Sequence, residues 1–168
     1  MTERDPRPRF AELLAVLVGH EVAFVIVGGA AAVLAGVWYA TDDLDIVPDY
    51  EPANLERLVG ALAALDGRHD DPAGRTIRPD VARLRASRLS LFVTRLGRLD
   101  VLRAIGRDRE YADLVPRSER LDLDGLVVRS ADLETLIEAK EVAGRTKDRE
   151  HLLLLREALR LRDLGSRS

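Results

Sequence analysis

The sequence predicts an α+β fold in which helices flank a small mixed β-sheet of about five strands and a pair of helices follows at the C-terminus. Three observations support this prediction. Apolar runs of strand length lie close together along the chain, two of them flank a short turn late in the sequence, and helical apolar periodicity dominates both ends. This order favours an α+β fold over a doubly wound parallel sheet.

Composition is consistent with one soluble domain. The 168 residues include 46% hydrophobic and 33% charged residues, which is typical of globular proteins. We expect a single domain over 1–168, with a core at about 10–130 and C-terminal helices at about 131–164. The absence of cysteine excludes disulfides and favours a cytoplasmic protein. We expect no signal peptide and no membrane span, since neither kind of apolar segment is present.

The first half of the chain alternates predicted helices and strands. The run "AFVIV" is β-branched at three positions and ends at Gly28 and Gly29, so it reads as a buried strand from which a helix departs. Pro48 stops the second strand. Helices are expected at 8–19, 30–37 and 51–66, strands at 23–27 and 44–47, and a loop at 67–80.

The second half contains a predicted hairpin and two helices. Strands at 89–94 and 99–105 flank the turn "RLGR". After an ambiguous segment and a short strand at 126–129, Ser130 is the expected cap of a helix over 131–143 that Gly144 ends. The last helix is expected at about 147–164.

Three aspartates form the candidate site. Asp43 and Asp45 are two positions apart in a strand and therefore project from the same face. Paired carboxylates repel unless a cation lies between them, and oxygen ligands favour Mg²⁺ or Mn²⁺. Asp100 lies in the apolar stretch "RLDVL" and would complete a two-metal site for phosphoryl transfer if its strand lies beside the first pair.

The turn at Gly28 and Gly29 joins a strand to a helix, where backbone N–H groups can hold a phosphate. It does not match the G-x-G-x-x-G pattern of dinucleotide-binding folds. A simpler alternative stays open, in which the glycines form only a tight turn and residues 42–45 are a solvated strand end.

The basic residues are distributed unevenly. Of 26, only Lys140 and Lys147 are lysines, which hints at positions that need a compact ammonium group. The stretch 75–109 contains ten arginines and three aspartates, in a chain whose net charge is −3. This stretch is consistent with an RNA footprint or, equally, with a solvated face. For Trp38 and Tyr39 we expect core or edge packing, with base stacking as the alternative.

Four motifs together resemble the nucleotidyltransferase superfamily of minimal polymerase-β-like enzymes, and within it the bacterial toxin and AbiEii-like branch. The resemblance covers about residues 10–160. Two departures stand out: Gly29 occupies a position where many relatives have serine, and Tyr39 occupies a position where relatives often have arginine. The motifs are "VGG" at 27–29, "TDDLD" at 41–45, "LDVL" at 99–102 and "LIEAKEVAGRTKD" at 136–148.

The resemblance implies a nucleotidyltransferase-like fold and an NTP substrate. It implies metal binding by the paired acids, triphosphate contact by the glycine turn and a phosphate contact by Lys140, with Asp148 as a further catalytic candidate. Thr41 and Lys147 complete the expected nucleotide-binding set. The acceptor would be RNA, such as a tRNA 3′ end, or a protein, and a toxin would have a cognate antitoxin. The alternative is a non-catalytic nucleotide-binding or interaction module that retains the fold.

Overall fold

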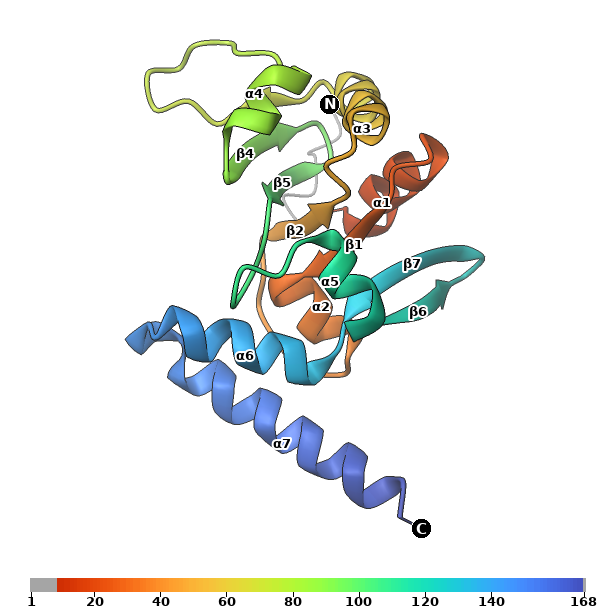
Figure 1. Cartoon of the computed structure of the whole chain (residues 1–168), viewed down its shortest axis with the longest axis vertical. Coiled ribbons are helices and arrows are strands. Elements are labelled where there is room, and N and C mark those ends of the chain that lie inside the picture. The colour runs from red at the N-terminus through yellow and green to blue at the C-terminus, as the bar shows by residue number, and fades with distance from the viewer. Residues whose placement is uncertain (1–8, 168) are drawn as a thin grey trace, which may run out of the picture.

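The computed structural model describes residues 9–167 and confirms the α+β prediction, with one mixed seven-stranded sheet in the order β3-β4-β5-β2-β1-β7-β6 (Figure 1). The strands span Phe24–Val27 (β1), Asp43–Pro48 (β2), Arg68–His69 (β3), Leu89–Thr94 (β4), Gly97–Leu102 (β5), Ser118–Leu123 (β6) and Leu126–Ala131 (β7). No helix within residues 9–167 is both long and apolar enough to cross a bilayer.

The central strands are fully buried or alternate between buried and half-buried residues. All four residues of β1 are buried, and it lies between β2, to which it is antiparallel, and β7, to which it is parallel. On its other side β2 runs parallel to β5, which forms the expected hairpin with β4. The centre of the sheet therefore carries the residues of the candidate site.

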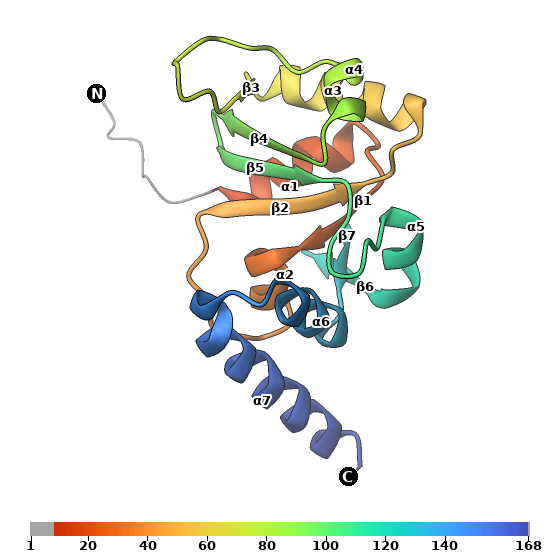
Figure 2. The ribbon, with the colours of Figure 1, turned by 60° about the vertical axis from the view of Figure 1, so that its left-hand side comes forward.

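Within the described residues, seven α-helices and two short 3-10 helices surround the sheet (Figure 2). Helices α1 and α3 pack against each other, α2 packs on β2 and α6, and α7 packs on α6. Their bounds are Phe10–Gly19 (α1), Gly28–Leu34 (α2), Pro52–Ala64 (α3), Val81–Ala86 (α4), Tyr111–Leu114 (α5), Leu133–Ala143 (α6) and Arg149–Gly165 (α7), with 3-10 turns at Val115–Arg117 (η1) and Thr146–Asp148 (η2).

Several predicted boundaries require correction. The expected loop at 67–80 contains β3, and the ambiguous segment contains α5, η1 and β6, so the sheet has two more strands than predicted. Helix α2 begins at Gly28 itself and ends before Gly36, whose positive φ of 86° suits only glycine without strain. The predicted helix start at Pro8 lies outside the described residues.

The cap of α6 was also predicted wrongly. Ser130 and Ala131 belong to β7, and Asp132 is the N-cap residue, with its carboxylate accepting a hydrogen bond of 2.8 Å from the Thr135 amide. The extended backbone of Asp132 lets its side chain cap the helix. The far end matches the prediction, since Gly144 terminates α6 in the left-handed conformation.

We expect Asp132→Ala to lower the free energy of unfolding by about 1 kcal/mol, because a helix amide loses its only side-chain acceptor. Ser130→Ala is the matched control. The Ser130 hydroxyl is buried and lacks a hydrogen-bond partner among the described residues, so its removal should be neutral or slightly stabilising. Urea denaturation of both variants measures the difference, and equal losses would contradict this assignment of the cap.

Candidate active site

The aspartates of β2 and β5 come together because of strand register. Along β2, half-buried Asp43 and Asp45 alternate with fully buried Leu44 and Ile46, as the pattern predicted. The parallel pairing of the two strands places Asp45 directly beside Asp100. Asp45 and Asp100 are therefore direct neighbours across the two strands.

This pair carries more negative charge than its surroundings neutralise. Burial, followed by the charges of Asp100 and Asp43, raises the pKa of Asp45 to about 7. Burial and the Asp43 charge also raise the pKa of Asp100. Lys140 acts in the opposite direction on Asp45 but does not compensate. Near neutral pH one proton is therefore partly retained between the two carboxyl groups.

Asp43 faces a different partner. Its strand neighbour on β5 is Arg98, whose Nε lies 3.2 Å from the Asp43 Oδ1 atom, and Arg98 also pairs with Asp70. Among residues 9–167, no three histidine or acidic side chains converge as a ready metal site. The three predicted metal ligands, Asp43, Asp45 and Asp100, are neighbours on β2 and β5, and Asp43 pairs with the guanidinium group of Arg98.

The donor set nevertheless fits a divalent cation. The buried Oδ1 atom of Asp100 lacks a hydrogen-bond partner among the described residues, and the buried Oδ1 atom of Asp43 has only its ion pair with Arg98. Unsatisfied buried carboxylate oxygens are costly, and a hard cation such as Mg²⁺ or Mn²⁺ prefers oxygen ligands. A divalent cation would neutralise the repulsion among the carboxylates of Asp43, Asp45 and Asp100.

The two glycines are required by close packing around these groups. Gly28 has φ of 66°, and a Cβ atom there would lie 2.2 Å from the Asp45 Oδ2 atom. A Cβ atom on Gly29 would lie 2.8 Å from Thr41 Cβ and 2.9 Å from Tyr39 Cε1. The turn therefore has a packing role independent of any phosphate.

Lys140 reaches the site from α6. Its Nζ atom lies 3.1 Å from the Asp148 Oδ1 atom and 3.2 Å from the Tyr39 hydroxyl. The side chain is 15% exposed. Burial opposes ionisation of Asp148, yet hydrogen bonds from Arg145 and Lys140 hold its pKa below the usual value. Asp148 thus anchors the ammonium group, a contact that the sequence motif left undefined.

A cleft of about 250 Å³ connects these groups, with Gly28, Asp45, Lys140 and Arg145 among its lining residues. Apolar side chains from the chain after β5 and from α6 form its other walls. The cleft is therefore polar on the side of Asp45, Lys140 and Arg145 and apolar on the other, as is usual for small-molecule pockets.

The remaining candidates lie less centrally. Thr41 donates its hydroxyl hydrogen to the Asp43 carbonyl at 3.0 Å, so it stabilises the approach to β2. Lys147 is exposed in η2. The expected packing of Trp38 was wrong, because this side chain is 85% exposed. Tyr39 packs on His151 with ring centroids 3.8 Å apart.

Sequence reasoning missed Arg98 and the role of Arg145. Arg98 precedes Asp100 by two positions and so shares its face of β5, a signal that was available. Many of the ten arginines at 75–109 are already paired with carboxylates of the protein and are therefore less available to bind RNA phosphates. Six of them form ion pairs with carboxylates: Arg75, Arg83, Arg88, Arg98, Arg103 and Arg109.

The fold is that of solved nucleotidyltransferase structures. No family model and no curated protein matches the chain. A candidate nucleotidyltransferase from Thermotoga maritima superposes with a TM-score of 0.54 and 14% identity over 85% of this chain and 87% of that one. ANT(2″)-Ia, solved in complex with adenylyl-2″-tobramycin, gives 0.55 and 18% over 89% and 87%. An antigenic nucleotidyltransferase-like protein from Paracoccidioides brasiliensis gives 0.53 and 16% over 91% and 76%.

The carboxyl pair predicts a pH-dependent stability of the metal-free protein. Because the pKa of Asp45 is higher in the folded state than in the unfolded chain, its stabilising contribution is complete below about pH 4 and declines as the pH rises through about 7. Above pH 7 we expect the free energy of unfolding of Asp45→Asn to exceed that of the parent by up to about 4 kcal/mol, and its melting temperature to be higher. The gain should shrink toward pH 4.

Thermal unfolding in a chelator, across this pH range, measures the effect. Asp42→Asn is the matched control, since Asp42 is adjacent, exposed and outside the pair. A gain that is independent of pH, or one shared by the Asp42 variant, would contradict the proposed sharing of a proton.

Proposed function

We propose that the chain is a Mg²⁺- or Mn²⁺-dependent nucleotidyltransferase that transfers an NMP from an NTP to an acceptor and releases pyrophosphate. The observation that carries this proposal is the pairing of Asp45 with Asp100 beside the glycine turn. The fold shared with solved nucleotidyltransferases supports it.

Each acidic residue has a proposed role. Asp43, Asp45 and Asp100 would hold the metal, and Asp43 now pairs with Arg98. The metal supplies charge neutralisation for the attacking and leaving oxygens. Asp100 is also our candidate for accepting the proton of the acceptor hydroxyl, because burial and the Asp43 charge raise its pKa.

The triphosphate would lie along the cleft between the glycine turn and α6. Lys140 lines this cleft together with Gly28 and Asp45. Its ammonium group is held by buried Asp148 and offers further donors to phosphate oxygens. Arg145 lines the same cleft and supplies a second cation. Gly29, Thr41 and Lys147 are proposed nucleotide contacts of lesser weight.

For the acceptor we propose an RNA, such as a tRNA 3′ end, or a protein hydroxyl group, because the sequence motifs resemble those of cytoplasmic toxins that are controlled by a cognate antitoxin. A small molecule is the competing acceptor class. The complex of ANT(2″)-Ia contains an adenylylated aminoglycoside, so a protein with this fold is compatible with such a product.

A second candidate function is nucleotide binding without transfer. The contact between Asp43 and Arg98 favours it, because it keeps one of the three proposed ligands neutralised by the protein itself. In that case an NTP would bind in the cleft and no labelled product would form.

A direct assay separates these functions. The parent and Asp45→Asn are incubated with each α-labelled NTP and Mg²⁺, in parallel with total RNA, a protein extract or tobramycin. Label transferred by the parent and absent with the variant supports the enzyme and identifies the acceptor class. Nucleotide binding without transfer to any acceptor supports the second candidate function.

Asp100→Asn should weaken binding of Mn²⁺, alone and with NTP, by at least about tenfold, because one charged oxygen ligand is lost. It should also raise the melting temperature of the metal-free protein, since repulsion with Asp45 is relieved. Calorimetric titration measures the binding, with Asp42→Asn as a control for charge. If Asp100→Asn binds Mn²⁺–NTP like the parent, Asp100 lies outside the metal site.

Lys140→Arg should reduce nucleotide transfer by at least about tenfold, or about 1.4 kcal/mol of transition-state stabilisation. The ammonium group contacts the Tyr39 hydroxyl and the Asp148 carboxylate, and we expect the wider, planar guanidinium group of arginine not to keep both contacts and reach the phosphate. Lys147→Arg, at an exposed position, should keep activity close to that of the parent. Steady-state kinetics on folded samples compares them, and full activity of Lys140→Arg would contradict the requirement for lysine.

A further inference from the structure

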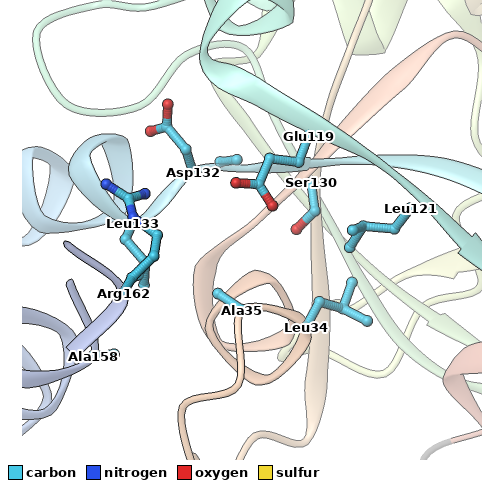
Figure 3. Close-up of a pocket in the computed structure, with 10 residues that line it drawn as sticks. Leu34, Ala35, Glu119, Leu121, Ser130, Asp132, Leu133, Ala158 and Arg162 are labelled. Atoms are coloured by element: carbon cyan, nitrogen blue, oxygen red, sulfur yellow. The ribbon is translucent and has the colours of Figure 1, made fainter. Parts of the chain in front are cut away.

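Helix α7 extends away from the body of the protein and packs by one side only (Figures 1 and 2). Leu155 is fully buried on that side, and Leu152 and Leu159 pack against the core. Figure 3 shows Ala158 and Arg162 of α7 near Leu34, the last residue of α2, and Ala35, which follows it; all four line one cavity. These residues define the side of α7 that faces the rest of the chain.

The opposite side of α7 combines leucines with charged residues and is uncovered by any described residue. Its four leucines are between 45% and 65% exposed, at positions Leu153, Leu154, Leu161 and Leu164. Isolated exposed leucines are common, but four on one side of one helix form a patch of the kind that marks an association surface.

The residues along this patch follow a heptad spacing. Steps of three and four residues connect Glu150, Leu153, Glu157, Arg160, Leu164 and Arg167, which is the spacing of a coiled-coil seam. In this order the series is Glu, Leu, Glu, Arg, Leu, Arg, and in reverse order it is Arg, Leu, Arg, Glu, Leu, Glu. Each glutamate therefore lies opposite an arginine of the reversed series, and each leucine opposite a leucine. A series with this property is complementary to a reversed copy of itself.

We propose that the exposed leucine face of α7 binds the same face of a second copy of this chain, with the two helices antiparallel about a twofold axis. A twofold interface is self-complementary, so each contact occurs twice. Along the seam, Leu153 meets Leu164 of the second copy, and Glu157 meets Arg160 of the second copy.

The flanking positions agree with the same register. In an antiparallel pair, each flank of one helix lies beside the equivalent flank of the other. On one flank Leu154 lies beside Leu161 of the second copy, which adds apolar contact to the pairing of Leu153 with Leu164 of the second copy. The other flank brings Arg156 to Asp163 of the second copy, which again pairs opposite charges.

A parallel pairing is disfavoured by the same charges. It would place Glu157 beside Glu157 of the second copy and Arg160 beside Arg160, and like charges at a seam are destabilising. The charges are available for exchange. Arg160 now pairs with Glu157 of its own helix and Arg156 with Glu141, and all four side chains are about half exposed. Exposed pairs of this kind contribute little, so replacing them costs little.

Analytical ultracentrifugation of the full chain over a range of micromolar concentrations tests the proposal. We expect a reversible dimer for the parent. Glu157→Arg and Arg160→Glu, as single changes, should each weaken dimerisation by at least about tenfold, because like charges then meet at the centre of the seam. The double variant, with both changes, should recover dimerisation since complementarity is restored.

Leu164→Ser should also weaken the dimer, whereas Leu89→Ser, at an equally exposed leucine on β4, should not. Circular dichroism verifies that each variant keeps its helix content. A parent that is monomeric throughout the range, a double variant no better than the single ones, or equal effects of the two leucine changes would each overturn the proposal. None of these outcomes depends on the nucleotide site.

Discussion

The structure is organised around two carboxyl groups that occupy neighbouring positions of the sheet. Because β2 and β5 are parallel and in register, Asp45 and Asp100 lie side by side, and burial together with the neighbouring charges raises the pKa of Asp45 to about 7. Their surroundings are adjusted to this pair. Gly28 leaves room for the Asp45 carboxylate, and Arg98 neutralises Asp43 on one side. A cluster of like charges at the centre of a sheet lowers the stability of the metal-free protein, and such a cost is typical of functional sites.

The C-terminal helices belong to this site through one buried acid. The Asp148 side chain is 4% exposed and holds both Lys140 of α6 and Arg145 of the following turn. Removing either cation would leave a buried charge partly unpaired, which is costly. The position of Lys140 above Asp45 therefore depends on the correct docking of α6 and η2. For this reason we propose that the helical pair and the sheet form a single domain.

Much of the fold and the positions of the acids followed from sequence, for physical reasons. Period-two alternation around Asp43 and Asp45 predicted their common face, and the burial of β1 followed from a continuous apolar run. The two-residue strand β3 was not predicted, because long-range pairing with β4 rather than local propensity stabilises it. Strand β6 was not predicted either, because charged residues interrupt its apolar pattern. The cap at Asp132 and the contact between Arg98 and Asp43 depend on backbone dihedrals and strand register, which local sequence does not specify.

Trp38 gives the protein an optical property of practical value. It is the one tryptophan in the sequence, and its indole is already 85% exposed on the segment that leads through Tyr39 and Thr41 to the aspartates. Unfolding therefore changes its solvent contact very little, so intrinsic emission is a poor measure of global denaturation. Because no second indole contributes, the tryptophan fluorescence of this chain reports the local surroundings of Trp38, in the segment between α2 and β2.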